Sequence, residues 1–336
     1  MKKSNPRVST AASIKRLTAY EGEYNLYEMT VNYDYDLDAL IGEAARDDQT
    51  FTDAAVAQAL PGISVKAAPP SFGCSAFCAK TDTAVLTGRN YDFKEDTSAL
   101  LVRANPKDGY ASIAFACLNN LGANEADMSI EQRAASLLAP FACLDGVNAM
   151  GVSIAVLTLD SVPVDQHAKA EAINTALTIR LVLDRAATTR EAVELLGRYD
   201  MHAMAGRDYH FFINDESGDS VVVEYDLLDP TRRMTVTPAR EITNFYALYA
   251  DQVKPNQING AFGHGKERAL AIAAILDEGA ATVEAAWAAL RASSQAPNPE
   301  DITSNTQWSV VYDNTNRTAR FVQRRHWGDT FLFTLD

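Results

Sequence analysis

The chain has 336 residues, of which 47% are hydrophobic and 22% are charged, as in a folded protein of one large domain or two modest ones. Its 44 acidic residues outnumber the 30 basic ones, and the net charge of −14 repels phosphate backbones and anionic lipids. We therefore expect no nucleic-acid partner and no membrane partner.

No apolar stretch approaches the roughly 20 residues that span a bilayer, and no apolar signal-peptide region follows the basic N-terminus. We therefore expect a cytoplasmic protein. In that setting Cys74, Cys78, Cys117 and Cys143 are predicted to be free thiols rather than two disulfides. The five histidines show no metal-ligand spacing, so we expect neither a metal site nor a cofactor.

Residues 1–73 differ in composition from the rest of the chain. An acidic, alanine-rich stretch over 34–60 has apolar residues at helical spacing. The segment 61–73 then contains three prolines and two glycines, a composition that breaks helices and favours an exposed linker. The sequence therefore predicts a boundary near Gly73, with a leader over 1–73 and a main domain over 74–336.

The main domain shows strand patterns at both ends and helical patterns between them. Strands are expected over 75–80, 84–87, 100–104, 111–118, 152–159, 210–214, 220–225, 308–313, 317–323 and 331–335, and helices over 174–183, 191–196, 266–278 and 283–293. This order favours an α+β layered domain over a doubly wound sheet. The glycine-rich segment 260–265 is expected to form a flexible loop over a pocket.

The first predicted hairpin of the main domain collects groups that suit nucleophilic catalysis. Its antiparallel strands bring Arg89 and Asp92 back towards Cys74. A cation lowers the pKa of a neighbouring thiol, and a carboxylate orients an amine beside the sulfur. A plain surface ion pair is the alternative for Arg89 and Asp92. Cys78, two residues further along the same strand face, is a weaker nucleophile candidate because no glycine precedes it.

The blocks Phe72–Phe77 and Leu86–Phe93 resemble the start of choloylglycine-hydrolase-type enzymes. This family of cysteine N-terminal-nucleophile hydrolases includes bile-salt hydrolases, penicillin V acylases and acid-ceramidase-like amidases. Their mature chains begin with Cys and carry Gly-Arg-Asn-x-Asp one hairpin later. Further similar blocks follow in the family's order, at 145–151, 210–224, 242–244, 267–268 and 308–312.

The resemblance implies a four-layer αββα sandwich and hydrolysis of a linear amide through a thioester. Cys74 would be the nucleophile, with its freed α-amino group as the base. Asp92 would hold that amine, and Arg89 would support the thiolate. Asn244 would donate to the oxyanion and Arg268 would steady the site electrostatically, although a strand end and a solvated charge are the plainer interpretations of these two.

Two further positions are possible oxyanion or substrate contacts. Thr158 stands where bile-salt hydrolases carry a second Asn, which makes bile salts less expected as substrates. Asn148 lies in an Asp-Gly-Val-Asn segment and is interpreted first as a turn residue. The leader suggests autocatalytic cleavage between Gly73 and Cys74, as in the acid-ceramidase group.

The expected partner is therefore a small-molecule amide, and the resemblance implies a homo-oligomer, often a tetramer. Two alternatives stay open at this point. The same site could transfer the acyl group to an amine or thiol, which would make the protein an acyltransferase. The chain could also be a non-catalytic binding protein that keeps its leader.

Overall fold

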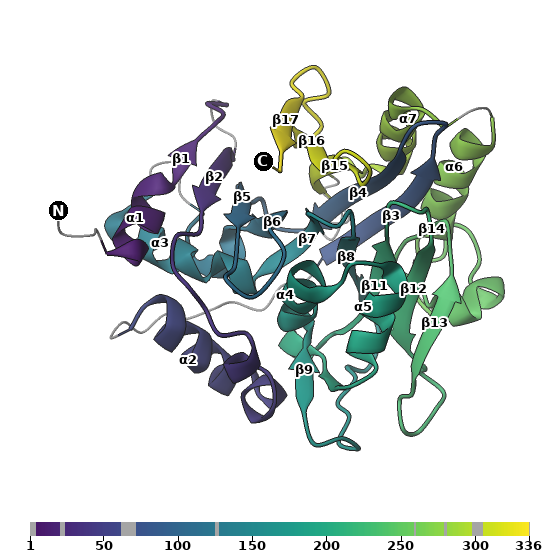
Figure 1. Ribbon diagram of the computed structural model, residues 1–336. Helices are drawn as coiled ribbons and strands as arrows, with labels where there is room; N and C mark the ends of the chain where they lie inside the picture. The colour runs from purple at the N-terminus through teal and green to yellow at the C-terminus, as the bar shows by residue number, and fades with distance from the viewer. Residues whose placement is uncertain are drawn as a thin grey trace.

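The computed structural model describes residues 5–20, 24–61, 72–124, 128–258, 260–278, 281–297 and 305–335. Within these ranges two antiparallel-rich sheets pack face to face, and helices cover their outer faces (Figure 1). No helix in the described part of the chain is both long enough and apolar enough to cross a bilayer.

The larger sheet has nine strands. In spatial order they are β1 (Lys15–Arg16), β2 (Leu26–Thr30), β5 (Ala99–Ala104), β6 (Ser112–Cys117), β7 (Cys143–Asn148), β8 (Ser153–Leu159), β11 (Asp208–Asn214), β12 (Ser220–Tyr225) and β13 (Met234–Pro238). Its central strands are buried along their whole length, as expected for strands covered on both faces.

The smaller sheet has six strands and carries the predicted catalytic hairpin. Its order is β14 (Glu241–Ile242), β3 (Phe72–Lys80), β4 (Val85–Phe93), β15 (Thr306–Asp313), β16 (Thr318–Gln323) and β17 (Phe331–Thr334). The polar turn after β3 is closed by a hydrogen bond from the Thr81 nitrogen to the Ala84 oxygen (2.8 Å). This turn sets the register that pairs Cys74 with Tyr91.

Aromatic side chains fill the space between the sheets, where Phe115 of β6 stacks on Phe321 of β16 with ring centroids 4.6 Å apart. The helices are α1 (Pro6–Ser13), α2 (Asp48–Ala59), α3 (Ile130–Ala135), α4 (Thr175–Arg185), α5 (Thr189–Leu196), α6 (Lys266–Asp277) and α7 (Val283–Ser293). Apolar residues of α6 and α7 pack on the smaller sheet, and α4 packs on β7 and β8. The expected αββα layering is thereby confirmed.

Shorter elements connect these layers. A two-stranded parallel sheet joins β9 (Ala172–Asn174) to β10 (Asp200–His202). Short 3-10 helices cover Asp38–Leu40, Glu43–Arg46, Asn119–Leu121, Ser136–Phe141, Met204–Gly206 and Ala247–Gln252. The last of these begins three residues after Asn244, and its first two backbone nitrogens donate to the Glu224 carboxylate.

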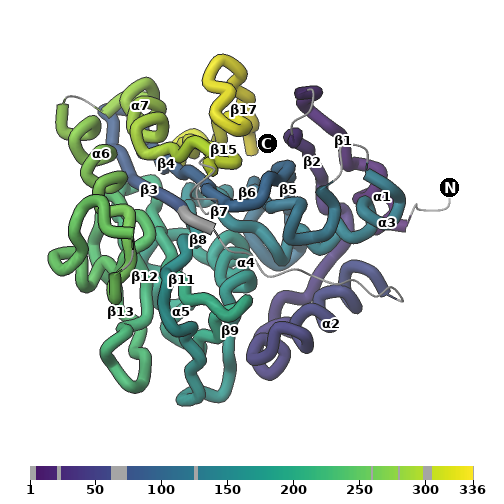
Figure 2. Tube along the Cα trace, turned by 180° about the vertical axis from the view of Figure 1, so that it is seen from behind, coloured from purple at the N-terminus to yellow at the C-terminus, as the bar shows by residue number. Residues whose placement is uncertain are grey.

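Residues 5–20 and 24–61 are built into the fold rather than set apart from it. Strand β2 pairs in parallel with β5, and Leu26, Met29 and Leu40 are fully buried. The purple N-terminal segment lies at the opposite end of the molecule from α6 and α7 in both views (Figures 1 and 2). The predicted leader therefore shares its core with the main domain. Of the predicted linker over 61–73, residues 62–71 lie outside the described residues, and Phe72 and Gly73 already belong to β3.

Candidate active site

Cys74 lies on β3 with no exposed surface. Its main-chain atoms are held by two groups from outside the hairpin. The Cys74 nitrogen donates to Oδ1 of Asn244 (2.9 Å), and Nη1 of Arg268 donates to the Cys74 carbonyl oxygen (2.8 Å). Asn244 and Arg268, the two predicted helpers from the C-terminal half of the chain, thus both contact Cys74, the predicted nucleophile.

The side-chain amide of Asn244 links three parts of the fold. Its Oδ1 also accepts from Nη2 of Arg268 (2.7 Å), and its Nδ2 donates to the carbonyl oxygen of Thr158 on β8 (2.9 Å). An amide nitrogen carries two hydrogens, and among the described residues only one acceptor, the Thr158 carbonyl, bonds to this nitrogen. This is the chemistry that an oxyanion contact needs.

Asp92 is fully buried on β4 and accepts three side-chain contacts. Thr306 Oγ1 and Gln295 Nε2 each donate at 2.6 Å, and Arg268 Nη1 lies 3.4 Å away. Burial raises the pKa of this carboxyl above its ordinary value, and Arg268 opposes that shift. Asp92 was expected to hold the Cys74 amine, but the single N–H of Cys74 in the uncut chain is directed to Asn244.

Arg89 is also fully buried and points between the sheets. Its Nη2 donates to the carbonyl oxygen of Val156 (2.7 Å), and its Nε lies 3.5 Å from Oδ2 of Asp145. Asp145 in turn accepts from the Tyr312 hydroxyl. Arg89 is therefore not a surface ion-pair residue, and its carboxylate partner is Asp145, which we did not predict as a site residue.

Burial has the largest effect on the pKa of the Cys74 thiol. Loss of solvent raises its pKa to about 11, although the charge of Arg89 and a hydrogen bond from Arg89 pull in the other direction. The sequence predicted a lowered pKa from the cationic neighbour alone. That prediction is wrong for the uncut chain, because the desolvation of the thiolate outweighs the attraction of one guanidinium.

The two possible substrate contacts differ in their surroundings. The Thr158 carbonyl joins the Asn244 network, and its buried hydroxyl Oγ1 has no hydrogen-bond partner among the described residues. Asn148 is occupied elsewhere. Its Nδ2 donates to the carbonyl oxygens of Leu183 and Ala186, and its Oδ1 accepts from two backbone nitrogens. Asn148 therefore has the contacts of a turn residue, outside the Cys74 network.

The other cysteines have no comparable surroundings. Cys78 is buried beside Asn214, and burial raises the pKa of its thiol to about 12. Burial also raises the pKa of Cys117 and that of Cys143. All four cysteines are free, as predicted. Across the described ranges, no three His, Cys, Asp or Glu side chains gather as a possible metal site.

The glycine-rich segment over 260–265 supports the site directly. Gly263 has a φ of +102°, and a Cβ there would lie 2.1 Å from the carbonyl oxygen of Asn244. At Gly265, with φ +84°, a Cβ would lie 2.5 Å from Nη2 of Arg268. The segment expected to be a flexible loop packs closely against two site residues, and only glycine allows this approach.

Sequence reasoning missed Gln295 and Thr306, which hold Asp92, and Asp145, which faces Arg89. The first two carry no local signal, because a polar residue after a helix end, such as Gln295, or at a strand start, such as Thr306, is common. Asp145 did offer one, since it begins the Asp-Gly-Val-Asn block that resembles the family.

Residues 74–229 match the model of the linear amide C–N hydrolases, choloylglycine hydrolase family. No curated protein matches the chain.

Solved structures share the fold. A penicillin V acylase from Agrobacterium tumefaciens is 19% identical, with a TM-score of 0.57 over 78% of this chain and 86% of that one. Two variants of the conjugated bile acid hydrolase from Clostridium perfringens are 14% and 15% identical, with TM-scores of 0.54 and 0.55 over 78% of this chain and 92% of theirs.

At these identities the structural similarity is evidence for the fold, and the match over residues 74–229 is evidence for the family. Together they support the resemblance seen in the sequence: residues 74–229 match the choloylglycine hydrolase family of linear amide C–N hydrolases, and the chain shares the fold of a penicillin V acylase and a conjugated bile acid hydrolase.

Proposed function

We propose that this protein hydrolyses a linear carboxamide through a thioester on Cys74, after Cys74 has cleaved its own bond to Gly73. The observation that carries the proposal is the pair of hydrogen bonds at the Cys74 main chain. Asn244 accepts from the nitrogen that cleavage would free, and Arg268 donates to the neighbouring carbonyl. A purely structural cysteine needs no such arrangement.

Self-cleavage would proceed by acyl transfer from nitrogen to sulfur. The Cys74 sulfur attacks the Gly73 carbonyl carbon, a C–S bond forms, the C–N bond breaks, and the thiol proton passes to the departing nitrogen. Water then hydrolyses the thioester, which gives a Gly73 carboxylate and restores the thiol. The free α-amino group, with an ordinary pKa near ~7.7–8.0, is then available as a base at neutral pH.

The same atoms would act on a substrate. The α-amine takes the thiol proton as the sulfur attacks the amide carbonyl, and a side-chain N–H of Asn244 faces the developing oxyanion. Loss of one such donor costs about 2.7–4 kcal/mol in other enzymes. The amine leaves with the proton, and water hydrolyses the thioester. Asp92, held by Thr306, Gln295 and Arg268, would keep the charge of the site balanced.

The substrate class that we propose is an N-acyl compound with an apolar acyl group. Proteins of the same fold are described as a penicillin V acylase and a conjugated bile acid hydrolase, which supports an amide of this general kind. A cytoplasmic location and a homo-oligomer stay predictions from the sequence and the resemblance.

Intact mass and N-terminal sequencing of the purified protein test the proposal. We expect a chain that begins at Cys74, and we expect Cys74→Ala to remain uncut. Cys78→Ala is the matched control, because Cys78 is buried on the same strand but lacks the Asn244 and Arg268 contacts. A wild-type chain that stays uncut and hydrolyses no amide would refute the proposal and favour a binding protein.

A further inference from the structure

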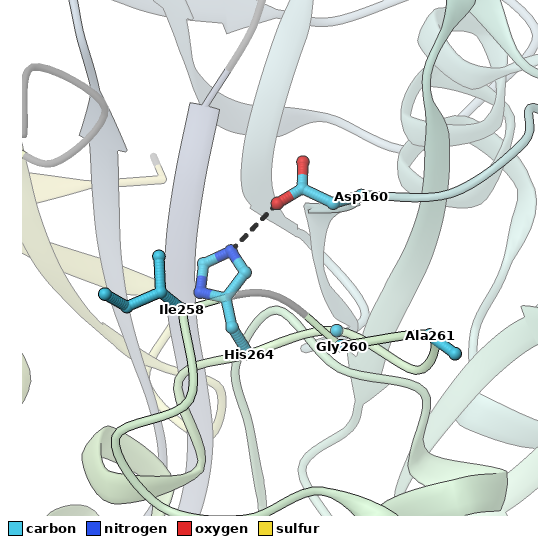
Figure 3. Close-up of a pocket in the computed structure, with 6 residues that line it drawn as sticks. Asp160, Ile258, Gly260, Ala261 and His264 are labelled. Carbon is cyan, nitrogen blue, oxygen red and sulfur yellow. Dashed lines mark ion pairs between the residues drawn. The ribbon is translucent and has the colours of Figure 1, made fainter.

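A polar pocket of about 430 Å³ adjoins the proposed site (Figure 3). It is lined by Asp160, Ile258, Gly260, Ala261, Gly263 and His264. One lining residue contacts the main chain of Asn244, and another lies near a hydrogen-bond partner of Asn244 in sequence. The His264 nitrogen donates to the Asn244 carbonyl oxygen (2.9 Å), and Asp160 lies two residues after Thr158, whose carbonyl accepts from Asn244. A group bound in this pocket would therefore lie close to the main chain of Asn244, the residue proposed to donate to the oxyanion.

The charged centre of the pocket is Asp160, whose side chain is 53% exposed. His264 Nε2 lies 3.2 Å from one carboxylate oxygen (Figure 3), and Arg207 Nη1 donates to the other at 3.0 Å. The hydrogen bond from His264, aided by Arg207, holds the pKa of Asp160 below its ordinary value. The pocket therefore presents a charged carboxylate whose remaining lone pairs can accept from a ligand.

This chemistry suits one side of an amide better than the other. An apolar acyl chain would remove water from Asp160 without giving a hydrogen bond in return, which is unfavourable. An amine portion with N–H or O–H groups could donate to the carboxylate. A second carboxylate would be repelled by Asp160, because the neighbouring cation Arg207 is already paired with Asp160.

We propose that this pocket is the amine-side subsite, that it takes an uncharged hydrogen-bonding amine portion, and that Asp160 disfavours amines that carry a carboxylate. The inference rests on the proposed function and adds its substrate class. It makes Asp160 and Arg207 specificity-determining residues with opposite effects.

Two matched amides with one acyl group test this assignment, N-hexanoyl-glycinamide and N-hexanoyl-glycine. For wild-type enzyme we expect a higher kcat/KM with the glycinamide. Asp160→Asn should shift the ratio towards the glycine compound by about tenfold, and Arg207→Gln should shift it the other way. Glu194→Gln is the matched control, because this exposed carboxylate pairs with Arg190 on α5 and should leave the ratio unchanged.

A second readout does not depend on amide hydrolysis. Chloroacetyl-glycinamide and chloroacetyl-glycine alkylate a thiol directly, so their labelling rates at Cys74 report the same preference. The subsite is supported if the ratio of the two labelling rates moves in opposite directions in Asp160→Asn and Arg207→Gln. This holds even if no amide is hydrolysed, and in that case only the proposed function fails. Ratios that stay unchanged in both variants, or a processed protein that neither reagent labels, overturn the subsite.

In a third pair of substrates, the difference in charge lies on the acyl group instead of the amine. It consists of succinyl and methyl-succinyl amides of one neutral amine. If Asp160→Asn changes the preference within this pair rather than within the glycine pair, the pocket holds the acyl group and the amine-side assignment is wrong. Melting temperatures of all variants exclude a loss of folding as the cause.

Discussion

Replacement of Arg268 by Met should damage stability and self-cleavage together. The guanidinium is largely buried and reaches the Cys74 carbonyl, the Asn244 Oδ1 and the Asp92 carboxylate at 2.8, 2.7 and 3.4 Å. Methionine fills a similar space without a charge or a donor. Removal of one partner of a buried ion pair typically costs about 3–5 kcal/mol, because the other charge stays buried.

The loss of unfolding free energy in Arg268→Met should depend on pH, and the pKa of Asp92 gives its direction. Burial already raises the pKa of Asp92 in the folded chain, and removal of Arg268 raises it further. A group with a raised folded pKa contributes stability that is present below its unfolded pKa, near ~3.9, and is lost as the pH rises through the folded value. The deficit of Arg268→Met should therefore be small near pH 4 and larger at pH 7.

Urea unfolding at several pH values measures this deficit, and intact mass measures cleavage. Arg268→Lys should lose less stability, because it keeps the charge but not the forked donors. Arg291→Met is the control, since Arg291 is exposed on α7 and its guanidinium lies over the Trp327 ring at 5.4 Å. Wild-type stability at pH 7 in Arg268→Met, with normal cleavage, would refute the reasoning.

Three further outcomes are expected. Because the pKa of the Cys74 thiol is about 11, cleavage that is limited by the thiolate should accelerate about tenfold per pH unit between pH 6 and 9. Intact mass measures the cleavage rate, and a rate that does not change with pH would exclude thiolate attack as the slow step. Gly263→Ala, whose Cβ would meet the Asn244 carbonyl oxygen at 2.1 Å, should cost at least about 2 kcal/mol in urea unfolding. Gly328→Ala, with open space around it, should cost little, and equal losses in the two variants would contradict the packing argument. After cleavage, residues 1–73 should co-elute with the remainder in size-exclusion chromatography, because residues 5–20 and 24–61 share its core; their separation without denaturant would show that the shared core does not hold them.

Most regular elements of the main domain could be predicted, because they carry strong local patterns. The strand over 152–159 is an apolar run, and it matches β8 at Ser153–Leu159. Thr188 caps α5, with its side chain accepting from the Glu191 nitrogen, and threonine at this position is a local signal for a helix start. Such signals depend only on neighbours in sequence, so one sequence suffices to see them.

Other elements could not be predicted, because their local composition contradicts their structure. Strand β7 contains Asp145, Gly146 and Asn148, which favour turns, yet it is buried between β6 and β8. The leader strand β2 is only five residues long. Strand β2 is stabilised by pairing with β5, and no pattern within residues 26–30 predicts this contact.

The site divides in the same way. Cys74, Arg89 and Asp92 lie in one hairpin, so their proximity follows from a single turn. Asn244 and Arg268 were expected only through the resemblance to a family. Gln295 contacts Asp92 across 203 positions of sequence, and no spacing rule reaches that far. The raised thiol pKa also required the structure, because it depends on burial rather than on neighbours.

The pairing of β2 with β5 joins strands that lie on opposite sides of the Gly73–Cys74 bond. Cleavage of that bond would turn one sheet of a single chain into a sheet shared by two chains. Before the cut, the covalent link keeps the two strands at a high effective concentration. After it, a denatured molecule could reassemble only by a second-order encounter of its fragments. Folding would thus have to precede the cut. If a mature molecule were unfolded and diluted, its two fragments would not regain the native structure.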